Sequence, residues 1–488
     1  MRVNYQVNAS PQFGILSDDQ CQEIVSAALR VLEHTGFVLH ADSDEIYDLL
    51  REGGATVEGT CVHIPPPVVR HAISTAPEVL TVYGMVGDDS TNLEIRPNHI
   101  YYGLGSGCVQ FMDPTTGERR RYLREDASAV AQVADGLRNI DFVQSLGTVD
   151  ADPRLTDVYE FAEMAAHTRK PIVTYARTLE IIEAIHEIAI ARAGSEEEFL
   201  RRPNYLVLGS PASPLFGEVE PTKRVVYCAE NQIPYISCTA PTAGATSPAT
   251  LAGTLVQSTA EVLAELVITQ SVNPGAPFMV GGVVSIMDMR SGILSYGAPE
   301  LSMLCAAFAE ISRSLGLPYY STAGCTDSKC VDQQAALEGT FSILIAGLSG
   351  ANLIHDTGYL EFGTTGSLQY VIMMEEVIGM TKRLLRGIQV TDETLAVSVI
   401  DRVGPRGQYL TDDHTMEHFK TESWFPTLLD RQQWEGWASQ GQKSLGDRAQ
   451  ERLNRILDSY ETPGGYEALR EEIDAILAKV EARVAQNS

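Results

Sequence analysis

Pro318-Tyr-Tyr-Ser-Thr-Ala-Gly324 and Ala351-Asn-Leu-Ile-His-Asp-Thr-Gly358 are the two stretches that decide the fold. In each, a short run typical of a strand ends in small and polar residues, and a helical pattern follows. Repeated strand-to-helix units build α/β barrels, in which the loops after the strands converge over one mouth and form the active site. The sequence therefore predicts functional residues in these two loops, with His355 first among them.

The same alternation of strand and helix repeats through the middle of the chain. Residues rich in β-branched and aromatic side chains, bounded by Gly or Pro, predict strands at 100–105, 142–148, 172–176, 204–209, 234–238, 278–284, 318–323 and 351–355. Helical patterns follow at 124–138, 155–169, 178–194, 220–231, 248–272, 298–315, 331–347 and 367–386. Eight strands, each followed by a helix, predict a (β/α)8 TIM barrel over residues 99–386. An open doubly wound sheet gives the same local signals, but Gly103-Leu-Gly-Ser-Gly107 lacks the third glycine of a dinucleotide-binding loop, which favours the barrel.

Two extensions flank the predicted barrel. Residues 1–98 predict an N-terminal helical and mixed extension, in which Ser17-Asp-Asp-Gln20 is a capping box that begins a helix. Residues 387–488 predict a charged C-terminal helical extension that contains all three tryptophans, at 424, 434 and 437. These tryptophans either pin the extension against the outside of the barrel or form a patch for a partner.

Composition argues against several classes of function. A net charge of −28, from 64 acidic and 36 basic residues, argues against a surface for nucleic acid or an anionic membrane. The eight cysteines form no C-x-x-C pair, the first residues have no apolar signal-peptide core, and apolar stretches such as 341–354 are too short to span a bilayer. We therefore expect a cytoplasmic protein with free thiols and no metal site.

Aromatic side chains recur at the same edge of the predicted barrel. Side chains alternate along a strand, so only one of Tyr101 and Tyr102, and one of Tyr319 and Tyr320, can point inward. A ring of aromatic faces suits a quaternary ammonium ion, which has no N–H to donate, whereas ordinary core filling is the alternative. Glycines near the first strand would let backbone approach a ligand, or they would serve as barrel bends. The candidates at this edge are Tyr102, Gly105, Gly107, Tyr175, Phe216, Tyr320, Tyr359 and Phe362.

Four segments together resemble the trimethylamine methyltransferase (MttB) superfamily over nearly the whole chain. They are Tyr102-Gly-Leu-Gly-Ser-Gly107, Asp113-Pro-Thr-Thr-Gly-Glu118, Thr326-Asp-Ser-Lys329 followed by Asp332-Gln-Gln-Ala335 and Glu338, and Leu353-Ile-His-Asp-Thr-Gly358. The resemblance implies a barrel enzyme that moves a methyl group from a methylated amine to the cobalt of a cognate corrinoid protein and binds no cofactor tightly itself. Archaeal members that use trimethylamine carry pyrrolysine, whereas this sequence uses the standard twenty residues. It is therefore similar to the branch that demethylates quaternary amines such as glycine betaine, proline betaine and carnitine.

This resemblance assigns expected roles. We expect glycine betaine as the substrate, Co(I) of a corrinoid partner as the methyl acceptor, and a homo-oligomer. His355 is expected to donate a hydrogen bond to the betaine carboxylate, together with backbone N–H groups of the glycine-rich first loop. The loops would be ordered by a second layer of side chains, namely Asp327, Asp332, Gln334, Glu338 and Asp356.

Three alternatives remain open at the level of sequence. The same reaction could use another betaine, or the protein could bind a betaine without turning it over. A barrel lyase or aldolase could use Lys329 or His355. The polar loop around Lys329 counts against that alternative, because a Schiff-base lysine needs an apolar pocket.

Overall fold

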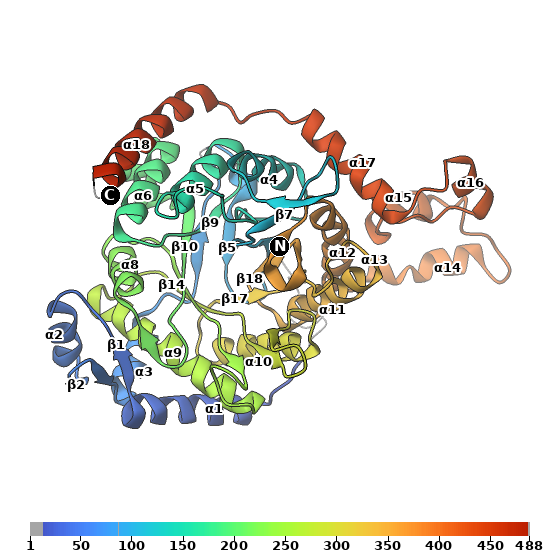
Figure 1. Cartoon of the computed structure of the whole chain (residues 1–488). Coiled ribbons are helices and arrows are strands. Elements are labelled where there is room, and N and C mark those ends of the chain that lie inside the picture. The colour runs from blue at the N-terminus through green and yellow to red at the C-terminus, as the bar shows by residue number, and fades with distance from the viewer. Residues whose placement is uncertain (1–12, 86, 487–488) are drawn as a thin grey trace.

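The computed structural model describes residues 13–85 and 87–486, and its centre is a curled parallel sheet, seen end-on in Figure 1. The seven strands have the order β6-β18-β17-β14-β12-β10-β9. Their bounds are β6 Tyr101–Leu104, β9 Ile172–Tyr175, β10 Tyr205–Gly209, β12 Tyr235–Thr239, β14 Phe278–Gly282, β17 Tyr319–Thr322 and β18 Leu353–Thr357. The strand expected at 142–148 does not form a ladder; isolated bridges join Phe142 to Gly103 and Val143 to Ile172. This segment therefore lies between the two edge strands and links them.

Helices surround the sheet on its outside, and each lies within a few residues of its predicted range (Figure 1). They are α4 Arg124–Gly136, α5 Thr156–His167, α6 Leu179–Ala193, α8 Val219–Glu230, α9 Leu251–Val272, α10 Pro299–Ser314, α11 Gln333–Ser349 and α12 Leu368–Arg386, with the short α7 Glu196–Arg201 after α6. Among the described helices, only α9 is long and apolar enough to cross a membrane. Because 78% of its apolar stretch is buried inside the fold, α9 is a core helix.

The N-terminal extension packs on the outside of the barrel. It consists of α1 Asp18–Arg30, β1 Phe37–Leu39, α2 Glu45–Glu52, β2 Thr56–Glu58, β3 Cys61–His63 and α3 Pro66–Thr75, and its helices contact α9. The predicted capping box is confirmed: the Ser17 hydroxyl accepts from the N–H of Gln20, and the Gln20 side chain accepts from the N–H of Ser17. Two of the orphan N–H donors at the start of α1 are thereby satisfied.

A hairpin of the same extension closes one end of the barrel. Strands β4 Leu80–Val82 and β5 Leu93–Ile95 bury four side chains in one cluster with inward residues of the barrel strands, among them Tyr101, Val173, Leu206, Met279 and Tyr320. The N–H of Tyr83 donates to Pro203 and the N–H of Met85 donates to Arg169, just before β10 and β9 begin. The hairpin thus plugs the N-terminal end of the strands and leaves the opposite end as the mouth.

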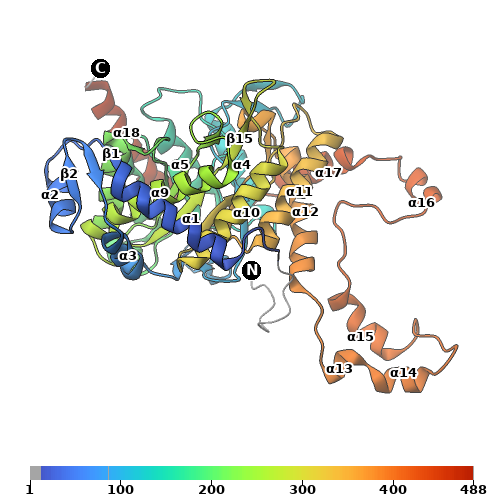
Figure 2. The same ribbon diagram turned by 90° about the horizontal axis from the view of Figure 1, so that it is seen from below.

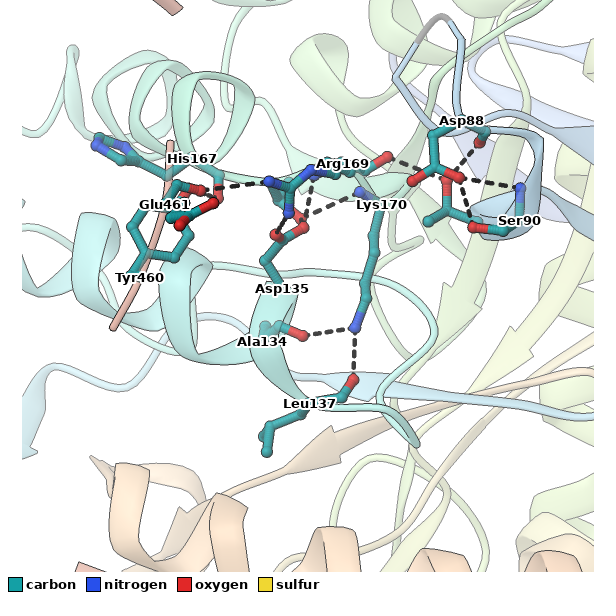
Figure 3. Close-up of polar contacts among 12 residues, drawn as sticks. Asp88, Ser90, Ala134, Asp135, Leu137, His167, Arg169, Lys170, Tyr460 and Glu461 are labelled. Atoms are coloured by element: carbon teal, nitrogen blue, oxygen red, sulfur yellow. Dashed lines mark hydrogen bonds and ion pairs between the residues drawn. The ribbon is translucent and has the colours of Figure 1, made fainter. Parts of the chain in front are cut away.

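The segment that precedes β9 ties both extensions to the barrel (Figure 3). The Arg169 guanidinium pairs with Asp135 at the end of α4 and donates to the carbonyl of Glu461, while Tyr460 donates to the carbonyl of His167. Beside it, the ammonium of buried Lys170 donates to the carbonyls of Ala134, Leu137 and Ile140, each at 2.6 Å. Lys170 therefore binds carbonyls at the end of α4 and in the loop that follows it.

Lys170 should give the fold a measurable pH dependence. Burial lowers the pKa of Lys170 from 10.5 to about 8, so between these values the unfolded chain binds more protons than the folded chain. The free energy of unfolding should therefore rise with pH in this window, by about 1 to 3 kcal/mol relative to Lys170→Met. Urea titrations of both proteins between pH 7.5 and 10.5 measure the difference, and parallel pH profiles would contradict the assignment.

The C-terminal extension contacts the barrel through residues 421–429, whose Thr427 and Leu428 N–H groups donate to Glu376 of α12, and through its last two helices. Helix α17 Leu445–Asp458 contacts α12 and α4, and α18 Tyr466–Gln486 contacts α6 and α5. Between α12 and α17, the chain forms α13 Asp392–Leu395, α14 Val397–Val403, α15 Asp413–Glu422 and α16 Trp434–Ser439. These four short helices extend away from the barrel (Figures 1 and 2).

Candidate functional site

Strand β18 carries the centre of the site. Its register against β6 shifts between Ile354 and Thr357, and Asp356 has a left-handed φ of 73°. Such bulges occur next to active sites, where they re-aim a side chain. Here the carboxylate of Asp356 lies beside the imidazole of its neighbour, with Oδ1 at 2.5 Å from Nδ1 of His355. Both residues are buried, with 2% and 4% of their surface exposed.

His355 is fixed by its neighbours on β17. Its ring stacks on the ring of Tyr320, with 4.1 Å between centroids and 21° between planes. Its Nε2 lies 3.2 Å from the hydroxyl oxygen of Thr322. Nδ1 lies within ion-pair distance of Asp356 but makes no hydrogen bond in the part of the chain described.

Asp356 is a buried carboxylate with no described Lys or Arg beside it, and the imidazole of His355 is its one ion-pairing neighbour in the described chain. Its Oδ2 has no hydrogen-bond partner, and no Lys or Arg pairs with it within residues 13–85 and 87–486. The backbone approaches closely at Gly105, where a Cβ would stand 2.5 Å from Oδ1 of Asp356. A buried charge of this kind costs several kcal/mol unless it is paired. A positively charged ligand at this place would supply the missing partner.

Three tyrosines surround the carboxylate. The rings of Tyr296 and Tyr359 meet edge to face with centroids 6.1 Å apart, and Tyr359 donates its hydroxyl proton to the carbonyl of Ser106. Tyr320 donates to the side-chain oxygen of Gln144 at 2.7 Å. Burial, and then the charge of Asp356, raise the pKa of all three tyrosines above the ordinary value, so they remain neutral phenols.

Three cysteines line the same region, and their thiols are unreactive. Burial first, and the charge of Asp356 second, raise the pKa values of Cys108, Cys238 and Cys325 well above the ordinary thiol value. A thiol kept protonated is a poor nucleophile and a poor metal ligand. The site therefore offers one anionic group and neutral aromatic faces, and the chemistry that it can support is the binding of a small organic cation.

The structure brings together five of the predicted residues and separates others from them. Gly105, Tyr320, His355, Asp356 and Tyr359 meet at the mouth. The expectation for Tyr102 is corrected: its side chain points out of the barrel, and its hydroxyl donates to the carbonyl of Ile343 on α11. The physical reason is strand alternation, since its neighbour Tyr101 takes the inward place, at the closed end.

Two further aromatic candidates, Tyr175 and Phe216, contact residues other than Asp356. The Arg224 guanidinium covers one face of Tyr175 at 4.5 Å from the ring centroid. Phe216 belongs to β11 Phe216–Gly217, which pairs with β1, and its ring meets His40 at 4.9 Å. These contacts remove Tyr175 and Phe216 from the aromatic group around Asp356.

The remaining predicted residues lie on the loops of the rim. Gly107 has a φ of 102°, and a Cβ there would meet no atom within 4 Å. Phe362 has its ring 5.8 Å from the ammonium of Lys329, and its N–H donates to the carbonyl of Thr326. Both belong to loops that follow barrel strands, away from the contacts of Asp356.

The loop after β17 is ordered by its own carboxylates. Asp332 caps α11 by accepting from the N–H of Ala335, and Glu338 accepts from Thr326, from the N–H of Asp327 and from Gln334. Asp327 accepts from the N–H of Tyr296 at 2.8 Å and from the hydroxyl of Ser295. The loop therefore acts on the mouth through Asp327, which holds Tyr296 in place.

Sequence reasoning missed Tyr296, Gln144 and Thr322. Tyr296 follows β15 Ser285–Asp288 and β16 Ile293–Leu294, a hairpin that the pattern of the sequence did not indicate. Its place just before Gly297-Ala-Pro299, where α10 begins, is the one local signal that it lies at a barrel loop. Gln144 was inside a predicted strand, but its inward direction depends on the bridges at Phe142 and Val143.

Comparison with known proteins assigns the chain to a family. The family described as trimethylamine methyltransferase (MTTB) matches residues 1–485. The trimethylamine methyltransferase MttB of Desulfitobacterium hafniense DCB-2 is 34% identical over 474 residues, which cover 96% of this chain and 94% of that protein. The glycine betaine methyltransferase of D. hafniense Y51 is 31% identical over 481 residues, or 98% of this chain and 97% of that protein.

A solved structure also matches most of the chain. The monomethylamine methyltransferase (MtmB) of Methanosarcina barkeri has a TM-score of 0.46 and 12% sequence identity, over 91% of this chain and 95% of that chain. The family match spans nearly the full length, and the two relatives from Desulfitobacterium exceed 30% identity over almost all of both chains. The chain therefore belongs to the trimethylamine methyltransferase (MTTB) family.

Proposed function

We propose that this protein transfers a methyl group from a small quaternary amine, with glycine betaine as its substrate, to the Co(I) of a corrinoid carried by a partner protein. The observation that carries the proposal is the buried carboxylate of Asp356, which has no described Lys or Arg beside it, one oxygen without a hydrogen bond, and Tyr296, Tyr320 and Tyr359 around it. A quaternary ammonium ion matches both features, since it needs a counter-charge and aromatic faces but no hydrogen-bond acceptor. We infer that segment 142–148 completes a (β/α)8 barrel, whose mouth holds this site.

The proposed reaction needs little acid–base chemistry. The C–N bond to one methyl group breaks, its electron pair stays on nitrogen, and a neutral tertiary amine leaves, while the methyl carbon forms its new bond to cobalt. No proton has to reach the nitrogen, which agrees with a site of neutral phenols and protonated thiols. The protein would act by holding the methyl group in line and by excluding water from the cation.

Asp356 would contribute to binding more than to the chemical step. The positive charge of the amine disappears as the amine leaves, so a carboxylate stabilises the bound substrate more than the transition state. The same loss of charge removes the attraction for the product, which helps the neutral amine to leave. The tyrosine faces favour the cation with less of this penalty, because a cation–π contact is weaker than a buried ion pair.

His355 would select for the carboxylate of a betaine. Once the substrate ammonium has taken the place beside Asp356, an N–H of the imidazole is available to the carboxylate at the other end of the substrate. Stacking on Tyr320 fixes the direction of this donor. A compact betaine such as glycine betaine fits these closely spaced groups better than the longer carnitine.

Methyl transfer to free Co(I) corrinoid tests the proposal against its alternatives. We expect the corrinoid spectrum to change to the methylated form when glycine betaine is added. Binding of glycine betaine without methyl transfer would support a betaine-binding protein instead. The lyase or aldolase alternative is disfavoured, because Lys329 is exposed and its ammonium donates to the carbonyl of Asp327 at 2.8 Å.

Replacement of Tyr320 by Leu tests the aromatic contact. We expect the half-saturating concentration of glycine betaine to rise by about 3- to 30-fold, since a desolvated cation–π contact contributes roughly 0.5–2 kcal/mol. Tyr319→Leu is the matched control, because Tyr319 is equally buried but packs outward against Phe308. Phe362→Leu should have a smaller effect than Tyr320→Leu. Equal effects of Tyr319→Leu and Tyr320→Leu would remove Tyr320 from the substrate site.

A further inference from the structure

One oxygen of the Asp356 carboxylate has no donor in the described part of the chain. Oδ1 lies 2.5 Å from Nδ1 of His355, whereas Oδ2 accepts no hydrogen bond from any described residue. The phenols beside it do not serve it, because Tyr320 and Tyr359 donate their protons to other acceptors. A buried acceptor without a donor costs free energy, and a ligand that brings a donor recovers this cost.

A quaternary ammonium ion balances the charge of Asp356 but leaves this oxygen without a hydrogen bond. All four substituents on its nitrogen are carbon, so it has no N–H to donate. A tertiary amine that has taken up a proton carries the same positive charge and one N–H. Its hydrogen bond to a carboxylate is charge-assisted, which makes it one of the stronger hydrogen bonds in proteins. The free oxygen of Asp356 therefore fits a protonated tertiary amine better than a quaternary one.

The proposed reaction produces such an amine. Glycine betaine loses one methyl group and leaves as neutral dimethylglycine. Aliphatic amines such as that of Lys keep a proton up to about pH 10, so dimethylglycine takes a proton from water once it is released. The product in solution is then an ammonium ion with one N–H, and it can return to the mouth as a cation.

Replacement of one N-methyl group by N–H has two opposing effects on binding. A hydrogen bond to a charged group strengthens binding by about 10- to 150-fold. Loss of one buried methyl group weakens binding by about fourfold. The two cations carry the same charge, so the tyrosine faces contribute similarly to both. The hydrogen bond is the larger effect, and the net preference for the product is about 3- to 40-fold.

We propose that the mouth binds protonated dimethylglycine more tightly than glycine betaine, through a hydrogen bond from the product N–H to Oδ2 of Asp356. The inference rests on the proposed function for the identity of the amine, but the binding itself needs no methyl transfer. The protein is then inhibited by its own product. Its rate of methyl transfer depends on another reaction that consumes the tertiary amine.

The same hydrogen bond holds back a second demethylation. As a C–N bond of dimethylglycine breaks, the positive charge leaves the nitrogen, so the N–H becomes a weaker donor to Asp356. An interaction that stabilises the bound amine more than the transition state lowers the rate constant of the chemical step. Dimethylglycine therefore binds tightly and reacts slowly, and one methyl group is removed from each glycine betaine.

Calorimetric titration with the two amines at neutral pH tests the preference without any corrinoid. The dissociation constant of dimethylglycine should be about 3- to 40-fold lower than that of glycine betaine. In Asp356→Asn the two amines should bind about equally, because a hydrogen bond to a neutral amide gains only about 2- to 12-fold, which the lost methyl group offsets. Asp332→Asn changes the same residue type in the neighbouring loop and should keep the full preference.

The amine proton of the bound product gives a second readout, in the unsubstituted protein. Magnetic resonance of dimethylglycine labelled isotopically on nitrogen reports the N–H directly. When the amine is bound, this proton should exchange with water at least about tenfold more slowly than in the free amine, since it is buried and hydrogen-bonded.

The possible outcomes separate this inference from the proposed function. Binding of dimethylglycine that is equal to or weaker than that of glycine betaine would overturn the inference and leave the proposed function standing. A preference that persists in Asp356→Asn, or an amine proton that exchanges as fast in the complex as in water, would overturn the hydrogen bond to Asp356. Absence of binding of both amines would contradict the cation site itself, and with it the proposed function.

Discussion

Asp356→Asn is expected to weaken binding of tetramethylammonium and glycine betaine by about a hundredfold, and at the same time to increase the free energy of unfolding of the ligand-free protein. Both effects follow from one observation, the buried carboxylate with no described Lys or Arg beside it and one oxygen without a hydrogen bond. Loss of the negative charge removes the partner of the ammonium ion, which reduces binding. It also removes a buried charge that no described Lys or Arg compensates, which favours the folded state. Asn tolerates the left-handed backbone at this position, so the bulge should persist.

Calorimetric titration and thermal unfolding of the same samples measure the two effects. Asp332→Asn is the matched control, since Asn is also a good helix cap and Asp332 lies in the neighbouring loop without contact to the mouth. The control should leave both binding constants unchanged. An Asp356→Asn variant that still binds tetramethylammonium normally would show that the carboxylate does not face the cation.

His355→Ala is expected to change the preference between two cations. Binding of glycine betaine should weaken by about 10- to 100-fold, the range for a hydrogen bond to a charged group, whereas tetramethylammonium, which has no carboxylate, should change much less. The ratio of the two dissociation constants therefore reports the carboxylate contact, and any general loosening of the mouth cancels in it.

The alternative role of His355 is structural, and the same variant tests it. The ring is buried and stacked on Tyr320, so its removal leaves a cavity and should lower the melting temperature by several degrees. Thermal unfolding of His355→Ala must still show a cooperative transition. A variant that fails to fold, or that loses affinity for both ligands equally, would identify His355 as a core residue and not as the carboxylate anchor.

Local patterns predicted the regular elements because the interactions that form them are local. The capping box at Ser17 is present as expected, and the helix predicted over 331–347 begins at Gln333, where Asp332 caps it through a residue three positions on. The eight barrel helices lie close to their predicted ranges. The strand at 142–148 was predicted from composition, but only isolated bridges form there, at Phe142, Val143 and Gly147, because pairing depends on distant partners.

The site could be predicted only in part, because it depends on departures from regular structure. Strand alternation would turn Asp356 away from His355, and the bulge in β18 reverses this, so a residue expected to order a loop lies at the centre of the mouth. Alternation along β6 gave two choices, and the structure selects Tyr101 for the interior and Tyr102 for the outer layer. Tyr296 reaches the mouth through a hydrogen bond to Asp327, a contact between loops that no local pattern encodes.

The contacts of the two extensions with the barrel were also not predicted by local sequence patterns. The hairpin β4–β5 contributes apolar side chains to the barrel interior, although its sequence position placed it in a flanking extension. Two tryptophans of the C-terminal extension have different surroundings: Trp424 lies beside Gly379 of α12, whereas Trp434 on α16 is 68% exposed. Pinning against the barrel therefore describes Trp424 and not Trp434.

The most direct test of methyl transfer uses glycine betaine with isotopically labelled N-methyl groups and Co(I) corrinoid under anaerobic conditions. We predict that the label appears in the methylated corrinoid, with one dimethylglycine formed for each methyl group transferred, and that Asp356→Asn reduces both products together. Absence of methylated corrinoid with glycine betaine, proline betaine, carnitine and tetramethylammonium, from a folded protein, would contradict the assignment of this site to quaternary amine demethylation.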